Sequence, residues 1–184
     1  MSLQRQQDIF ARLYTDSEFR KEFLNDPGAF AEGLGVTSPE ARGLATFGAD
    51  ELSWFSESLY SKRLREVRKM LPMTEEALGT SKFAETFREF SDGFSSVSVK
   101  KHLEDSLALS NFLVRSPSID PRVRNIALFE SSRLFHNAVQ KRFSLCFLRY
   151  DPRAPVSEGR STRRGFGLWI AIGKWSRIVF RAKP

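Results

Sequence analysis

Few residues of this chain are soft metal ligands. Only the two histidines, His102 and His136, and the single cysteine, Cys146, belong to that class. A transition-metal site needs several such ligands brought together, whereas these three lie on three separate expected elements. His102 precedes Glu104 and Asp105, which favours a histidine on a helix surface over a metal ligand. We expect Cys146 to be a buried structural thiol, and a single cysteine excludes an internal disulfide.

The sequence also lacks the local motifs of enzymes that act alone. It contains neither a glycine-rich phosphate loop nor a G-x-S-x-G elbow. The pair Glu75-Glu76 fits carboxylates near the N-terminus of a helix. No nucleophile, base and oxyanion hole can be assembled from neighbouring residues. We therefore expect a binding protein rather than an enzyme, with no cofactor held by this chain.

A dense group of basic residues is the first candidate binding site. Residues 58–71 have apolar side chains at helical spacing, which predicts a helix with one buried stripe. Beside that stripe lie five basic residues: Lys62, Arg63, Arg65, Arg68 and Lys69. Such a face suits a nucleic-acid backbone or an acidic patch on a partner protein. The alternative is that these side chains lie over the core with only their charges in water.

The charge of the chain is concentrated near its C-terminus. The formal net charge is +7. Residues 141–184 contain 11 Lys/Arg and 2 Asp/Glu, whereas residues 1–140 contain 18 and 20. A basic segment attached to a nearly neutral body predicts a docking surface for something acidic. Nucleic acid, an acidic peptide and an acidic partner protein all satisfy this requirement.

The basic segment also carries a pattern of strands. Alternating apolar residues predict strands at about 142–150, 165–172 and 175–181, with Gly173-Lys174 forming a type II′ turn between the last two. An open edge of this sheet can bind a peptide as an added strand. The residues predicted to bind it are Arg163, Arg164, Arg177, Ile178, Val179, Phe180 and Arg181. The alternative is an ordinary edge strand that basic side chains protect against aggregation.

Helices are expected throughout the chain before residue 142. Asp26-Pro27 and Asp120-Pro121 each place a capping residue before a proline at the first helical position. Pro72 ends the long helix predicted over residues 51–71. Gly79 suits the left-handed end of the short helix that follows.

The clearest break in the chain is the segment 116–121, which is rich in serine and proline. We predict a mostly helical domain over residues 1–115 and a C-terminal α+β unit over residues 116–184. In that unit, a helix over residues 122–141 should cover one face of a small antiparallel sheet, because three strands alone are marginally stable. The predicted fold class is therefore α+β.

The helix–proline–helix segment also carries a resemblance. The residues that carry it are Arg63, Val67, Leu71-Pro72, Ala77-Leu78-Gly79, Phe83-Ala84 and Phe87. Over roughly residues 1–115 the chain resembles the helical domain of HvfC-like proteins, which include methanobactin C subunits. The resemblance implies an accessory subunit that partners a TIM-barrel iron oxygenase acting on cysteine in a ribosomally made peptide. The iron belongs to that partner enzyme.

The expected location follows from two absences in the sequence. No apolar run approaches the ~20 residues needed to span a bilayer, so no membrane partner is predicted. The first ten residues lack the layout of a signal peptide. We expect a cytoplasmic, non-catalytic accessory subunit that binds a precursor peptide and partners a metal-dependent enzyme. The alternative function is a nucleic-acid-binding transcriptional regulator.

Overall fold

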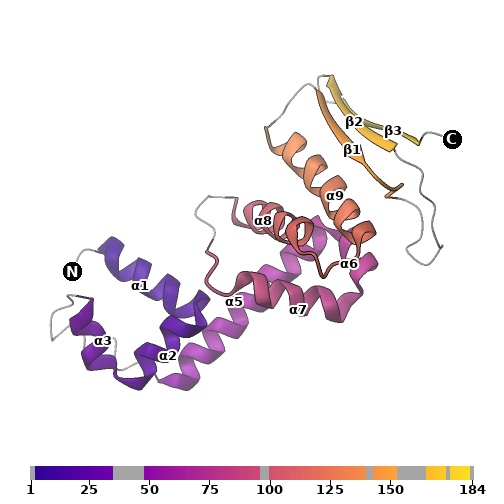
Figure 1. Cartoon of the computed structure of the whole chain (residues 1–184). Coiled ribbons are helices and arrows are strands. Elements are labelled where there is room, and N and C mark those ends of the chain that lie inside the picture. The colour runs from indigo at the N-terminus through magenta and orange to yellow at the C-terminus, as the bar shows by residue number, and fades with distance from the viewer. Residues whose placement is uncertain are drawn as a thin grey trace. The chain divides into compact units, whose positions relative to one another are not determined.

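The computed structural model describes residues 3–34, 48–95, 100–139, 143–152, 165–172 and 175–182. Helices dominate these residues, which confirms the mostly helical character expected from the sequence. In chain order the elements are α1 (Leu3–Thr15), α2 (Ser17–Asn25), α3 (Pro27–Gly33), α5 (Ala49–Met70), α6 (Pro72–Leu78), α7 (Thr80–Ser91), α8 (Lys101–Arg115), α9 (Pro121–Val139), β1 (Phe143–Leu148), β2 (Gly165–Ile172) and β3 (Trp175–Ala182) (Figure 1). No helix within the described ranges is long and apolar enough to cross a membrane.

Several helix ends are formed by capping, proline or glycine residues at the ends themselves. The side chain of Asp16 caps α2 by accepting a hydrogen bond from the amide three residues later, at 2.9 Å. Pro72 is the first residue of α6, and Gly79 follows that helix with a φ of +82°. At the start of α9, Asp120 accepts a hydrogen bond from the amide of Arg122 at 2.7 Å. Each of these ends is determined by residues close in sequence.

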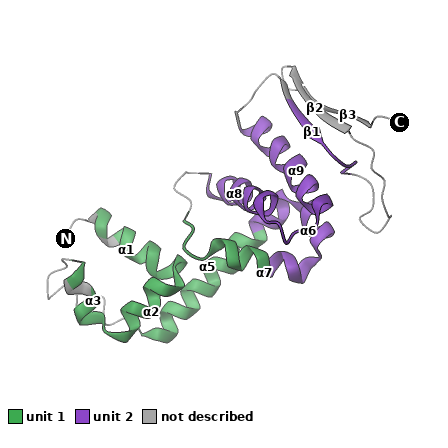
Figure 2. Ribbon diagram, viewed as in Figure 1, with its two compact units in different colours: residues 1–65, 86–97 green, residues 66–85, 98–184 purple. Residues whose placement is uncertain are grey.

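The chain divides into two compact units (Figure 2). Unit 1 comprises residues 1–65 and 86–97, and unit 2 comprises residues 66–85 and 98–184. This grouping differs from the predicted boundary after residue 115, because α8 and α9 pack against each other inside unit 2. The helices α5 and α7 each contribute residues to both units.

The core of unit 1 is formed by apolar residues of α1, α2 and α5. Ile9 and Leu13 lie one helical turn apart on α1 and are both buried. They form a cluster with Phe19 and Phe23 of α2 and with Leu52 of α5. Hydrophobic burial therefore holds the first half of α5 in place against α1 and α2.

The core of unit 2 is formed by apolar residues of α7, α8 and α9 and by Leu71 at the corner before α6. Its fully buried residues include Leu71, Phe83, Leu109, Leu113 and Ala127. The segment between α8 and α9 is a tight turn, in which the amide of Ile119 donates to the carbonyl of Ser116 at 3.3 Å. Because both flanking helices share one core, this turn joins neighbours within a unit.

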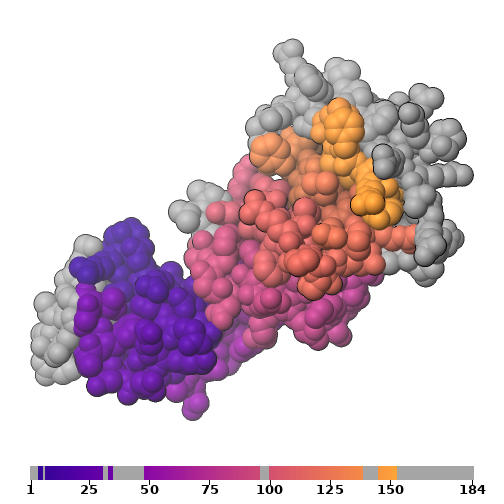
Figure 3. Space-filling view, viewed as in Figure 1, coloured from indigo at the N-terminus to yellow at the C-terminus, as the bar shows by residue number. Residues whose placement is uncertain are grey.

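The strands of unit 2 lie in the order β1-β2-β3. The pairs β1–β2 and β2–β3 are both antiparallel. Phe166 of the central strand β2 is paired with Phe147 of β1 and with Arg181 of β3. The helix α9 packs against β1, as the sequence predicts for the helix over residues 122–141, and Phe129 of α9 clusters with Cys146 and Leu148. In the space-filling view, the orange atoms of α9 and β1 lie side by side on this face of unit 2 (Figure 3).

Candidate functional site

The histidines and the cysteine lie in three different settings. His102 is exposed on α8, whereas His136 of α9 and Cys146 of β1 are buried. Burial raises the pKa of the Cys146 thiol, with a hydrogen bond from Ser132 acting in the opposite direction. A buried thiol with a raised pKa is a poor nucleophile. Among the described residues, no group of three or more His, Cys, Asp or Glu is arranged to hold a metal ion.

The five basic residues predicted on α5 have different environments. Lys62, Arg65 and Lys69 are exposed. Lys69 pairs with Glu66 at 2.8 Å, which neutralises part of the charge on this face. The guanidinium of Arg63 donates to the carbonyl of Phe94 at 3.2 Å within unit 1. Arg63 is thus partly engaged in stabilising its own unit.

Arg68 has a structural role in unit 2. Its Nε lies 3.0 Å from a carboxylate oxygen of Glu75, and its Nη2 donates to the carbonyl of Thr80 at 3.4 Å. These contacts join the end of α5 to α6 and to the start of α7 across the Pro72 corner. The exposed part of the predicted face is therefore Lys62, Arg65 and Lys69.

The predicted peptide-binding residues from Arg177 to Arg181 all belong to β3. In the register of the sheet, Arg177 lies opposite Ile170 and Val179 lies opposite Leu168. Among the described strands, β3 pairs with β2 alone and therefore forms one edge of the sheet. Arg163, Arg164 and the turn at Gly173-Lys174 lie outside the described residues.

A buried carboxylate at the centre of unit 2 was not predicted from the sequence. Glu130 of α9 is fully buried, and its two oxygens accept three hydrogen bonds from the start of α6. The amide of Met73 donates at 3.1 Å, and the amide and hydroxyl of Thr74 donate at 2.8 and 2.7 Å. Burial raises the pKa of Glu130, while these hydrogen bonds and Arg133 act in the opposite direction.

The helical phase of α9 contains the signal for this site. Glu130 follows the buried residues Ile126 and Ala127 by one turn and precedes buried Leu134 by another. A carboxylate inside an apolar stripe predicts burial with hydrogen-bonding partners, because an unpartnered buried charge is very costly. The partner, α6, lies more than fifty residues earlier in the chain and cannot be deduced from this pattern.

A second buried polar residue of α9 fixes the end of β1. The side-chain amide of Asn125 donates to the carbonyl of Tyr150 at 2.9 Å. Its oxygen accepts hydrogen bonds from the amides of Arg149 and Tyr150 at 2.8 and 3.3 Å. Asn125 thus satisfies three backbone groups where the chain leaves the sheet.

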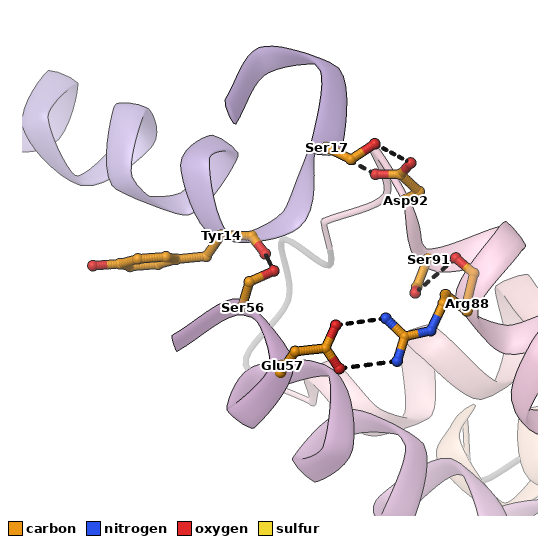
Figure 4. Close-up of polar contacts among 7 residues, drawn as sticks. All are labelled: Tyr14, Ser17, Ser56, Glu57, Arg88, Ser91 and Asp92. Carbon is orange, nitrogen blue, oxygen red and sulfur yellow. Dashed lines mark hydrogen bonds and ion pairs between the residues drawn. The ribbon is translucent and has the colours of Figure 1, made fainter. Parts of the chain in front are cut away.

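Unit 1 is held together by polar contacts nearer its surface (Figure 4). Arg88 donates from both terminal nitrogens to the two carboxylate oxygens of Glu57, at 2.7 and 2.9 Å, and lies over the ring of Tyr60. The carboxylate of Asp92 accepts hydrogen bonds from the amide and hydroxyl of Ser17 at 2.8 and 2.6 Å. These contacts join α7 to α5 and to the start of α2.

The two carboxylates of this group are held in their charged forms. The hydrogen bond from Arg88 lowers the pKa of Glu57. Burial raises the pKa of Asp92, but the hydrogen bonds from Ser17 and the nearby charges of Arg20 and Lys21 outweigh it, so the pKa lies below its ordinary value. The arrangement stabilises folded unit 1 and leaves neither carboxylate available as a proton acceptor at neutral pH.

No family model matches the chain, and neither does any curated protein or any solved structure. The resemblance to HvfC-like proteins therefore stays a prediction from the motif residues around Pro72. Of those residues, Val67, Leu71, Phe83 and Phe87 are buried. A role in core packing is therefore enough to explain why these residue types occur at these positions.

Proposed function

We propose that the chain is a non-catalytic accessory subunit that binds a ribosomally made precursor peptide and partners a metal-dependent modifying enzyme. The observation that supports peptide binding is an edge strand, β3, in a strongly basic unit. Unit 2 contains twenty Lys/Arg and ten Asp/Glu, a balance of +10. A small C-terminal antiparallel sheet in an α+β unit is the part of the fold on which the proposal depends.

The proposed binding mode is strand addition along β3. Backbone amides and carbonyls at a sheet edge give affinity for an extended peptide, and side chains at alternate positions give selectivity. Arg177 and Arg181 are four residues apart and so lie on the same face of the strand, with Val179 between them in phase. This spacing favours an extended peptide with two carboxylates four residues apart, which is roughly 13 Å along a strand that rises about 3.4 Å per residue.

The partner enzyme in this proposal comes from the resemblance. It is a TIM-barrel iron oxygenase-like protein that holds the iron and performs the oxidation, while this chain supplies the peptide. The test is reconstitution with such an enzyme, if one is encoded beside this chain together with a short cysteine-bearing peptide. Peptide modification should require both proteins, and full activity of the enzyme alone would remove the accessory role.

The test of the peptide site is a titration with an acetylated eight-residue peptide of alternating Glu and Val. Reversing two charges, Arg177→Glu with Arg181→Glu, should weaken binding at least ten-fold, which corresponds to about 1.4 kcal/mol. The matched control is Lys101→Glu with Arg115→Glu, two exposed residues of unit 2 that change the net charge equally. Equal weakening by both pairs would show a general charge effect, and no weakening would remove Arg177 and Arg181 from the site.

A backbone substitution provides a second test of the same edge. Val179→Pro removes a main-chain donor from β3 and should disturb the strand. Circular dichroism distinguishes a local loss of peptide binding from unfolding. A folded Val179→Pro protein that binds the peptide as tightly as the wild type would contradict strand addition at β3.

The alternative function is nucleic-acid binding through the exposed residues Lys62, Arg65 and Lys69 of α5. Binding to duplex DNA would then weaken steeply with salt, because each neutralised phosphate releases counterions. Replacing these three residues by Ala would reduce the slope of affinity against salt. Tight, sequence-selective DNA binding by the isolated chain would favour this function over the accessory role.

A further inference from the structure

A row of aromatic rings lies along the surface of unit 1. On α1, the rings of Phe10 and Tyr14 are stacked with their centroids 6.2 Å apart. Tyr14 contacts Phe55 of α5 at 5.7 Å, and Phe55 contacts Trp54 edge-on at 5.1 Å. The row ends at the surface, where Phe55 is 45% exposed and Trp54 is 66% exposed.

The core of unit 1 does not use the exposed end of this row. The α1 and α5 positions inside the core are Ile9, Leu13 and Leu52, all buried. Exposing a tryptophan and a neighbouring phenylalanine to water is unfavourable, and adjacent exposed aromatic side chains are typical of protein interfaces. Packing on Tyr14 covers part of Phe55, but it leaves 66% of Trp54 exposed, so the outer end of the row is open to a partner.

The row is held in a fixed position by polar contacts beside it. The hydroxyl of Ser56 donates to the backbone carbonyl of Tyr14 at 2.9 Å, which joins the end of α1 to α5. Figure 4 shows the Tyr14 ring extending away from this contact. A ring platform that is already ordered loses little conformational entropy when a partner binds.

The surroundings of the row are acidic. Asp50 and Glu51 are exposed in the first turn of α5, one helical turn before Trp54 and Phe55. Burial raises the pKa of Tyr14, and the negative charge of Glu51 adds to that rise. Apart from residues 62–65, unit 1 contains six Lys/Arg and twelve Asp/Glu.

We propose that this aromatic row is a docking surface for a basic segment of a partner protein. An Arg or Lys side chain of the partner lies over the exposed ring of Trp54, the aromatic side chain that binds cations best. Asp50 and Glu51 pair with further basic residues of the same segment, and the faces of Phe55 and Tyr14 receive its apolar residues. This surface is separate from the β3 edge and selects the opposite charge.

The primary test measures the affinity of the full chain for an acetylated hexapeptide of alternating Arg and Leu by calorimetry. Trp54→Ala should weaken binding at least ten-fold, since central aromatic residues dominate binding at interfaces. The matched control is Phe147→Ala, another large exposed ring that lies in unit 2 and is 76% exposed. Undiminished binding by Trp54→Ala would overturn the proposal.

The charge requirement has its own matched pair of variants. Asp50→Lys with Glu51→Lys should weaken binding about ten-fold. Glu22→Lys with Glu89→Lys changes the net charge of unit 1 equally at two other exposed positions and should have little effect. Equal effects of the two pairs, or equal binding of a peptide of alternating Glu and Leu, would overturn the assignment of a basic partner.

Two further measurements locate the site and exclude self-association. In a chain carrying Trp169→Phe and Trp175→Phe, Trp54 is the remaining tryptophan, so its fluorescence should change as the basic peptide binds. Sedimentation at rising concentration should show a monomer. An oligomer that Trp54→Ala dissociates would assign the row to a second copy of this chain and overturn the partner.

Discussion

The two units of this chain differ in charge and in how their helices are joined. Unit 1 has nine Lys/Arg and twelve Asp/Glu, whereas unit 2 has twenty and ten. Unit 1 joins its helices through the Glu57–Arg88 pair, whose two side chains are each 55% exposed. Unit 2 uses Glu130 and Asn125, which are both buried. Because one unit relies on exposed polar contacts and the other on buried ones, the two units should differ in their sensitivity to mutation.

The largest expected effect comes from Glu130→Ala in unit 2. The substitution leaves the amides of Met73 and Thr74 and the Thr74 hydroxyl without their acceptor in a buried site. Leaving such groups unsatisfied should cost on the order of 3 kcal/mol of unfolding free energy. Urea unfolding measures this loss, and Glu76→Ala at an exposed position of α6 is the control. A loss no greater than that of the control would show that the buried carboxylate does not hold α6.

The same carboxylate gives unit 2 a distinctive pH dependence. Because burial raises the pKa of Glu130 above its unfolded value, the folded chain binds more protons between those two pKa values. The contribution of Glu130 to stability therefore falls as pH rises through that window. Glu130→Gln does not titrate, so the stability of the wild type relative to this variant should decline with rising pH. A relative stability that increases with pH would mean that the hydrogen bonds outweigh burial.

Asn125→Ala should have the next largest effect. It removes the partner of three backbone groups at Arg149 and Tyr150 and should cost about 1–3 kcal/mol. Asn125→Asp keeps the acceptor for the two amides but places a second oxygen against the Tyr150 carbonyl. Hydrogen exchange of the β1 amides should accelerate in Asn125→Ala. Unchanged exchange there would show that α9 secures β1 by apolar packing alone.

These residues illustrate what local sequence patterns can and cannot predict. Pro72, Gly79 and Asp120-Pro121 were interpretable because a proline ring or a capping carboxylate acts on its immediate neighbours. The partner of Glu130 could not be predicted in this way, because Thr74 is 56 residues away and the pairing depends on how α6 packs on α9. A break at Ser116 is visible in the sequence, but the packing of α8 on α9 across it is not.

For the candidate sites, the sequence predicted where charged residues cluster but not which contacts those residues make. The basic residues of α5 form an obvious group in the sequence, yet the partners that engage Arg63 and Arg68 come from other segments. The aromatic pair Trp54 and Phe55 of α5 was not identified as a candidate site from the sequence. The structure shows that the contact to Tyr14 leaves both rings substantially exposed, because Leu52 takes the core position.

The smallest expected effect comes from Arg88→Ala in unit 1, where the contrast with buried Glu130 is sharpest. Although the Arg88–Glu57 pair has two short hydrogen bonds, water screens it. Exposed ion pairs contribute about 0.5–1 kcal/mol at most. Because the substitution also removes the contact of Arg88 with the Tyr60 ring, the unfolding free energy in urea should fall by about 1–2 kcal/mol in total. Lys21→Ala breaks the exposed Lys21–Glu18 contact of 2.6 Å and is the control for a pair without bidentate geometry.

The pH dependence of this pair has the sign opposite to that of Glu130. The pKa of Glu57 lies below its unfolded value because of the hydrogen bond to Arg88, so the folded chain binds fewer protons. The stability from Glu57 is present above the unfolded pKa and is lost as pH falls through the folded pKa. In Arg88→Ala, an NMR titration of the Glu57 carboxyl should therefore show a higher pKa than in the wild type. An unchanged pKa would mean that Arg88 does not hold this carboxylate in solution, so that this pair does not join α7 to α5.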